Sequence, residues 1–212
     1  MNQEEREMLA IRHQYRKVFS TEKGLEELDS SLKNKKGTIL QRYAYHFGWN
    51  EVELKQFLAE RKQSFKQATK SRCQGFSEKG SEEDGFVKFV DWYWKQEQKC
   101  CYCGVKSEHL KYYFNEDNEQ YQNARKRGKT LEIERLITAP TNVYNKNNCA
   151  LACYICNNAR SDFISPEDFK PIAQGINQFW QNVLSKKGID ISYLTDFKSI
   201  WEKVEKKLNN QK

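Results

Sequence analysis

Four cysteines of this chain form two pairs, and each pair has the spacing of a metal-binding turn. Cys100 and Cys103 make one CxxC pair, and Cys153 and Cys156 make a second pair 50 residues further on. Two such turns supply the four thiolates of a tetrahedral zinc site, in which the metal joins segments that are distant in sequence. The spacing therefore predicts one structural zinc ion that holds the two ends of the intervening segment together.

Three of the seven cysteines lie outside these pairs. Cys149 is expected to point into the core, Cys73 has no partner in the pattern, and Cys101 is an adjacent thiol that complicates the choice of ligands. A redox dithiol is the alternative interpretation of a CxxC pair, but it needs only one pair and does not account for the second. A disulfide framework is not expected, because the cytosol, where we expect this protein, keeps thiols reduced.

Polar residues with metal-binding oxygens lie beside the cysteine pairs. Glu134 is in the run LEIERL, Asn148 precedes the second pair in NNCALAC, and Asn157 directly follows Cys156 and precedes the residues ARSD. Together with the CCYCG turn, these residues resemble the HNH, or ββα-metal, endonuclease family over about residues 86–170. The nine-residue interval between the two asparagines is similar to that in the HNH domain of RNA-guided CRISPR nucleases.

The resemblance implies specific roles for these residues. Glu134 matches the acidic metal ligand at the end of a strand, Asn157 matches the second protein ligand, and Asn148 matches the loop asparagine that holds the active-site turn in place. Magnesium or manganese would be the catalytic ion, because such cations prefer oxygen donors and keep several waters. One carboxylate and one amide leave room on the ion for a scissile phosphate.

The sequence departs from the family at the general base. The histidine that should follow the acid is replaced by Arg135, which stays protonated but suits a phosphate group. Tyr144 is our candidate base, although its phenol would need a pKa well below 10, and a core or stacking role is the alternative. His109, six residues after Cys103, is the competing candidate.

The sequence pattern around these residues predicts an α+β fold that is mainly helical. Residues 1–76 form a helical arm, with Leu25, Leu28 and Leu32 expected on one helix face. Gly48 ends one helix and Asn50 begins the next, with Glu53 at its third position. This arrangement is typical of a helix-turn-helix and equally of an ordinary helical hairpin.

The rest of the chain is expected to contain the nuclease core. Residues 77–85 are a linker, residues 86–170 are the ββα-metal core with its zinc site, and residues 171–212 are helices packed on that core. A helix is predicted to start at Ser165-Pro166, and a last helix carries an apolar face. The apolar residues of this last helix are Phe197, Ile200, Trp201, Val204 and Leu208.

Charge and composition agree with a nucleic-acid partner without requiring one. The net charge is +7. Basic residues gather in the stretch from Arg61 to Arg72, and we expect both this stretch and the second basic cluster near phosphates, although a solvated surface accounts for them too. The second cluster consists of Arg125, Lys126, Arg127 and Lys129. No apolar stretch reaches the length of a membrane span, and the first residues lack the signal-peptide pattern, so a cytoplasmic protein is expected.

Three functions are compatible with these features. The first is an active endonuclease on double-stranded DNA in restriction or phage defence, acting as a homodimer or with a partner protein of a defence system. The second is a zinc-stabilised nucleic-acid-binding module that has lost catalysis together with the histidine. The third, a protein-interaction domain, leaves Arg135 and the basic clusters without a purpose. Retention of Glu134 and Asn157 favours the enzyme.

Overall fold

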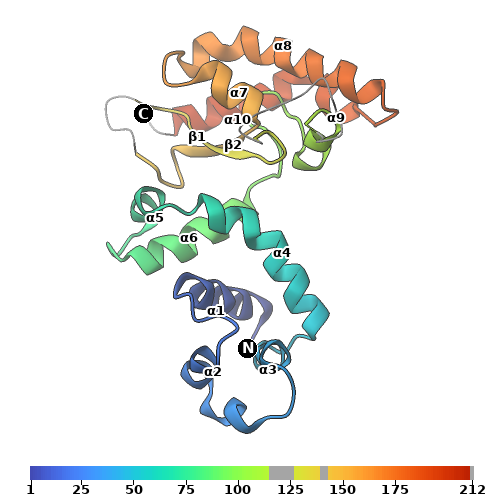
Figure 1. Cartoon of the computed structure of the whole chain (residues 1–212). Coiled ribbons are helices and arrows are strands. Elements are labelled where there is room, and N and C mark those ends of the chain that lie inside the picture. Colours follow the sequence, from blue (N-terminus) through green and yellow to red (C-terminus); the bar gives the residue numbers. More distant parts are fainter. Residues whose placement is uncertain (115–126, 139–142, 211–212) are drawn as a thin grey trace. The chain divides into compact units, whose positions relative to one another are not determined.

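The computed structural model describes residues 1–114, 127–138 and 143–210. The chain divides into two compact units, which we call unit 1 (Met1–Tyr93) and unit 2 (Trp94–Lys212). Helices dominate both units, and the two strands in the described residues pair in unit 2 (Figure 1), so the fold is of the mainly helical α+β class.

The elements of unit 1 are, in chain order, α1 (Gln3–Tyr15), α2 (Glu22–Leu28), the 3-10 helix η1 (Ser30–Asn34), α3 (Ile39–Phe47), α4 (Glu51–Gln67), α5 (Lys70–Phe76) and α6 (Glu82–Lys95), whose last two residues belong to unit 2. The elements that follow are the 3-10 helix η2 (Ser107–Tyr112), β1 (Glu132–Arg135), β2 (Cys149–Ala152), α7 (Tyr154–Arg160), α8 (Pro166–Ser185), α9 (Ser192–Thr195) and α10 (Phe197–Asn209).

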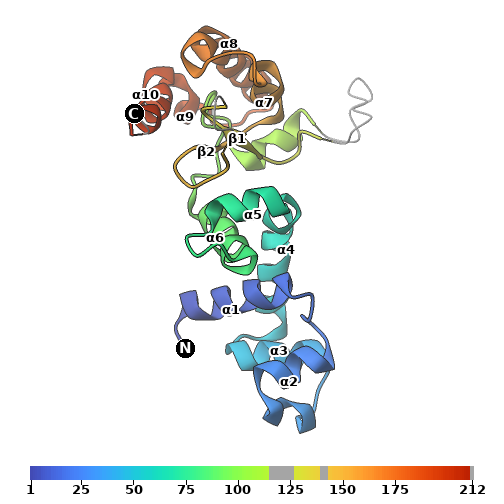
Figure 2. The same ribbon diagram turned by 90° about the vertical axis from the view of Figure 1, so that its left-hand side faces the viewer.

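Unit 1 is a helical body (Figure 2). Local side-chain caps set its turns. Gly48 ends α3 in the left-handed conformation at φ 68°, which glycine adopts without steric strain. Asn50 then caps α4 by accepting a hydrogen bond from the backbone N–H of Glu53, and the Glu53 carboxylate bonds back to the N–H of Asn50. Both helix boundaries predicted around Gly48 and Asn50 are confirmed.

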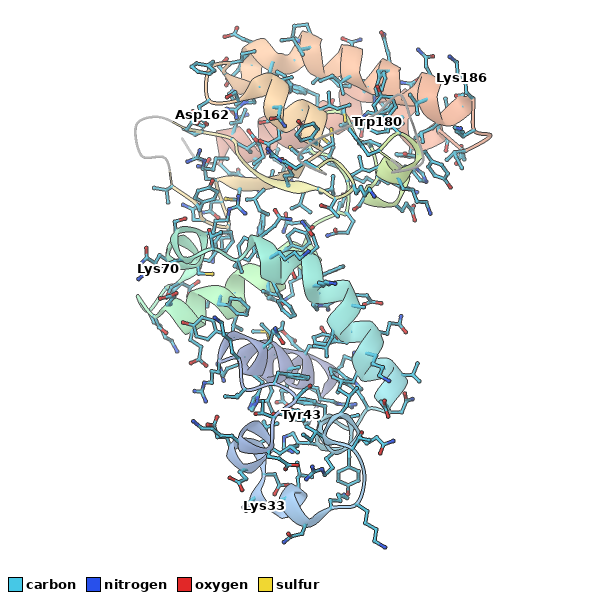
Figure 3. All side chains as sticks on the ribbon, viewed as in Figure 1. Lys33, Tyr43, Lys70, Asp162, Trp180 and Lys186 are labelled. Carbon is cyan, nitrogen blue, oxygen red and sulfur yellow. The ribbon has the colours of Figure 1, made fainter. Side chains whose placement is uncertain are left out.

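The core of unit 1 forms around Tyr43 on α3 (Figure 3). Its ring is buried against Phe19 and Phe47, with ring centroids 4.7 Å and 6.3 Å away. Its hydroxyl donates to the backbone carbonyl of Val18 at 2.8 Å, so the one polar atom of this buried ring is satisfied.

One prediction for unit 1 was wrong, because Leu25, Leu28 and Leu32 do not share a helix face. The helix α2 ends at Leu28, and the Asp29 side chain accepts a hydrogen bond from the N–H of Ser31 to begin η1. Leu25 and Leu32 are buried, whereas Leu28 is half-buried. An aspartate that bonds to its own following backbone favours a turn over continued helix, and here it overrides the apolar spacing.

Unit 2 contains a short antiparallel pair of strands next to a small helix. β1 pairs with β2 in the register Glu132 to Ala152 and Glu134 to Ala150. The chain leaves β2 directly into α7, and α7 lies between β1 and α8 (Figures 1 and 2). Trp180 of α8 and Trp201 of α10 are almost fully buried in this unit.

The long helix α8 begins where the sequence predicts, and α10 is the last helix, for which the sequence predicts an apolar face. Ser165 caps α8 by accepting from the N–H of Asp168 at 3.0 Å, and Pro166 occupies the first helical position. On α10, Trp201, Val204 and Leu208 are buried. Within the described ranges, no helix has both the length and the apolar content needed to cross a bilayer.

Candidate active site

The four paired cysteines converge in the interior of unit 2. The Sγ atoms of Cys100, Cys103, Cys153 and Cys156 all lie within 4.8 Å of one another, and all four residues are buried. The Cys103 and Cys153 sulfurs are 3.7 Å apart. A zinc–sulfur bond of about 2.3 Å in a tetrahedron places two sulfurs about 3.8 Å apart, whereas a disulfide needs about 2.0 Å. The cluster, which we call the four-thiol cluster, therefore fits a metal such as zinc.

The first cysteine pair is shaped by a tight turn that requires glycine. The N–H of Gly104 donates to the Cys100 carbonyl at 2.9 Å, and the N–H of Cys100 donates to the Val105 carbonyl at 2.8 Å. Gly104 has φ 80°, and a Cβ there would lie 2.5 Å from the Ile200 side chain. Any other residue would therefore strain the turn and collide with α10.

The second cysteine pair is shaped by the start of α7. Cys153 follows β2 and is the N-cap residue of the helix, and its sulfur accepts from the N–H of Cys156 at 3.5 Å. Cys149 is fully buried, as predicted, and the half-buried Cys101 is not part of the four-thiol cluster. The helix that carries Asn157 therefore begins at the four-thiol cluster.

Two side chains of β1 face two side chains of α7. Glu132 and Glu134 point to the same side of the strand, because side chains alternate along it. Asn157 and Arg160 lie on one face of α7, because residues three apart on a helix are neighbours. Glu132 contacts Asn157 and Glu134 contacts Arg160, so two polar pairs lie side by side between the strand and the helix.

The inner pair is a buried ion pair. The side chains of Glu134 and Arg160 are 5% and 2% exposed, and Arg160 Nη1 donates to Glu134 Oε1. The Tyr102 hydroxyl donates to the same oxygen at 3.1 Å. Arg160 also donates to the carbonyls of Arg135 and Leu136, at 3.0 Å and 2.7 Å. Burial raises the pKa of Glu134 to about 7, and the charge of Arg160 opposes this rise.

The outer pair is closer to solvent. Asn157 Nδ2 donates to Glu132 Oε2 at 2.6 Å, and the Glu132 side chain is 16% exposed. Arg127 binds both carboxylate oxygens of Glu132, at 2.9 Å and 2.6 Å, and its guanidinium lies 5.0 Å from the centre of the Tyr154 ring. The resemblance implies that Glu134 and Asn157 bind one ion. In the structure, Glu134 pairs with Arg160, whereas Asn157 pairs with Glu132.

Asn148 connects the two ends of the loop between the strands. Its Nδ2 donates to the carbonyls of Ile137 and Val143, at 2.7 Å and 2.9 Å, and its Oδ1 accepts from the N–H of Ile137 at 2.9 Å. It is 5% exposed. These contacts place Asn148 where it can hold the loop, which is the role implied by its resemblance to the loop asparagine of the HNH family.

Arg135 and Tyr144 lie together on the outer part of this loop region. The Arg135 guanidinium is 4.7 Å from the centre of the Tyr144 ring, and it forms an ion pair at 3.3 Å with the exposed Asp162. The guanidinium thus packs over the ring. Asp162 is labelled in Figure 3.

Comparison of the chain with protein-family models, with curated proteins and with solved structures found no match. The roles of the site residues therefore follow from their own chemistry and contacts.

His109 belongs to a different group of residues. Its Nδ1 lies 2.6 Å from the Tyr193 hydroxyl, and the Lys106 ammonium is 4.6 Å from the centre of the Tyr193 ring. Burial lowers the pKa of His109. Among the described residues, the hydrogen bond, ion pair and ring contacts of His109 do not reach Glu132, Glu134 or Asn157. The structure therefore gives no support to His109 as the competing base.

The structure describes part of the two basic clusters for which nucleic-acid contacts are predicted. Arg125 and Lys126 of the second basic cluster lie outside the described residues. In unit 1, Arg61 bonds to Glu7 at 3.0 Å, which ties one of the basic residues of α4 to α1. The first turn of α4 carries two carboxylates, Glu51 and Glu53. Glu53 belongs to the capping box of α4 with Asn50.

Sequence reasoning did not find Glu132, Arg160 or Tyr102. A signal was available, because Glu132 and Glu134 share one face of a predicted strand and Asn157 and Arg160 have the i, i+3 spacing of one helix face. Two carboxylates opposite an amide and a guanidinium could have been recognised as two pairs. Which carboxylate faces which partner depends on how far α7 is shifted along β1. That shift is set by contacts between segments far apart in the chain, so residue spacing alone does not reveal it.

Proposed function

We propose that this chain is an HNH-type endonuclease that hydrolyses phosphodiester bonds in DNA with a divalent metal ion. The observation that supports it best is the position of Asn157. This amide lies on a short helix that starts at the four-thiol cluster, and it is 2.6 Å from a carboxylate of the paired strand β1. A strand carboxylate and a helix amide are oxygen donors suited to magnesium or manganese.

The four-thiol cluster would hold a structural zinc ion in this proposal. Four buried sulfurs form a closed site, with no position left for a substrate. The role of zinc is then to fix the first cysteine turn and the start of α7 relative to each other. That fixes Asn157 against β1.

The chemistry assigned to the remaining residues follows from their charge and position. A magnesium or manganese ion at the β1 carboxylates and Asn157 would stabilise negative charge on the phosphate oxygens and on the leaving oxygen. The resemblance assigns Glu134 as the carboxylate ligand, but its buried pairing with Arg160 favours Glu132 instead. Arg135 binds the scissile phosphate, and Asn148 holds the loop that carries Tyr144.

Purified protein is expected to cut supercoiled plasmid DNA in magnesium or manganese and to leave it intact in excess EDTA. Asn157→Ala removes the amide from the metal position and should abolish cutting. Asn158→Ala is the matched control, because Asn158 is the next residue, is exposed and donates to the Tyr154 carbonyl of its own helix. Cutting that persists in EDTA, or in Asn157→Ala, would contradict the proposal.

The second candidate is a zinc-stabilised module that binds nucleic acid without cutting it. The burial of Glu134 against Arg160 and the replacement of the usual histidine by Arg135 favour it. DNA binding that weakens steeply with salt, combined with no cutting in any divalent metal, would select this module over the enzyme.

Tyr144→Phe is expected to lower the cutting rate by about 10²–10⁴-fold while DNA affinity stays nearly unchanged, because it removes only the phenolic oxygen, which as the phenolate would accept the proton of the attacking water. Arg135→Ala should lower both rate and affinity, because the guanidinium contacts the phosphate. Single-turnover cleavage and DNA binding would be measured on the same samples, with His109→Ala as the control. Normal turnover in Tyr144→Phe beside an inactive His109→Ala would reverse the assignment.

A further inference from the structure

The two carboxylates on β1 have different access to water. The Glu134 side chain is 5% exposed and faces Arg160, which is 2% exposed. The Glu132 side chain is 16% exposed and faces a half-buried asparagine, Asn157, and Arg127, which is 38% exposed. The positions are only two residues apart on one face of the strand, yet they differ in burial and in their partners.

Glu134 is poorly suited to bind a catalytic metal. Magnesium and manganese keep several waters when bound in enzymes of this kind, and a carboxylate enclosed by Tyr102 and Arg160 has little room for them. Arg160 cannot easily withdraw, because two backbone carbonyls hold its guanidinium in place. A divalent ion beside this fixed and buried cation would be strongly repelled.

Glu132 meets the requirements that Glu134 fails. It is partly exposed, it lies at hydrogen-bond distance from the Asn157 amide, and both its oxygens already bind a cationic group, the Arg127 guanidinium. The Arg127 side chain is 38% exposed, so its guanidinium can turn into solvent. A divalent cation can therefore displace Arg127, and rotation of the Asn157 amide would present its Oδ1 in place of its Nδ2.

From these contrasts we infer that Glu132, together with Asn157, binds the catalytic divalent metal, and that Glu134 serves as the buried partner of Arg160. This inference rests on the proposed nuclease function for the role of the ion. It moves the acidic ligand two residues along the strand from the position that the resemblance implies. Arg127 becomes the cation that occupies the carboxylate until the metal binds.

The test uses the full-length, zinc-loaded protein and measures manganese binding by the electron paramagnetic resonance signal of free Mn²⁺. Glu132→Gln should weaken manganese binding by about tenfold or more and leave the melting temperature of the protein nearly unchanged. Glu134→Gln, measured in the cold where it remains folded, should bind manganese as the unaltered protein does. Glu202→Gln, a change at an exposed carboxylate on α10, is the control.

Arg127→Gln gives an independent arm of the same experiment. Removing the competing cation should strengthen manganese binding, whereas a purely structural Arg127–Glu132 pair would give unchanged or weaker binding. Unaltered manganese affinity in Glu132→Gln, or its loss in a folded Glu134→Gln protein, would overturn the inference.

The outcomes also separate this inference from the proposed function. If manganese binds through Glu132 but the protein never cuts DNA, the metal site stands and the nuclease proposal fails. If the protein cuts DNA and Glu132→Gln cuts at the same rate with the same manganese affinity, the nuclease proposal stands and the assignment of Glu132 fails.

Discussion

Replacing one cysteine of the four-thiol cluster is expected to destabilise unit 2 strongly. Cys153→Ser removes a thiolate from a closed, buried site and breaks the connection between the first cysteine turn and the start of α7. Structural zinc contributes about 10–16 kcal/mol in small zinc-binding peptides. Unit 2 also has a core built on α8 and α10, so we expect loss of the strand pair and α7 first, with the helices following at lower temperature than in the unaltered protein.

The measurement combines elemental analysis with thermal melting followed by circular dichroism. The unaltered protein should contain one zinc per chain and should lose its structure in a strong chelator. Cys101→Ser is the matched control, because Cys101 is next to Cys100 but lies outside the four-thiol cluster. Absence of zinc, or a Cys153→Ser protein that melts like the unaltered one, would refute the zinc site.

Replacing Glu134 is expected to destabilise unit 2 by about 3–5 kcal/mol, because Glu134→Leu leaves the buried Arg160 guanidinium without its charged partner. Arg160→Met removes the charge that opposes the rise in the pKa of Glu134, so the buried carboxyl takes up a proton and two backbone carbonyls lose their donor. Burial already raises the pKa of Glu134 to about 7, so the pairing does not fully compensate for the loss of water around the carboxylate.

The double variant, Glu134→Leu with Arg160→Met, should therefore be less destabilised than the sum of the single variants. It will not fully recover, because Arg160 also donates to the carbonyls of Arg135 and Leu136. Hydrogen exchange of the amides of β1 and α7 reports the stability of this region directly. Glu202→Gln, a change at an exposed carboxylate on α10, is the control, with an expected loss of about 1 kcal/mol or less. Additive effects of the two single changes would argue against the pair.

The amino-acid sequence by itself determined those features of this protein that depend on contacts between residues a few positions apart. Asn50 and Ser165 begin helices because their side chains bond to backbone N–H groups three residues further on, wherever the rest of the chain lies. The same local chemistry accounts for the failed prediction around Leu28, because Asp29 supplies a turn that the apolar spacing ignores. The approach of the four paired cysteines was also predictable, because two CxxC turns in one chain are the usual donor set of a tetrathiolate zinc site.

Only the tertiary structure decided the partners of the two β1 carboxylates. Residue types and spacing place Glu132, Glu134, Asn157 and Arg160 between a strand and a helix, but they fit either of two pairings. The position of α7 along β1 selects one of them, and that position depends on packing between segments far apart in the sequence. Burial depends on the same packing, so the sequence alone could not distinguish a buried ion pair from an accessible oxygen donor two residues away.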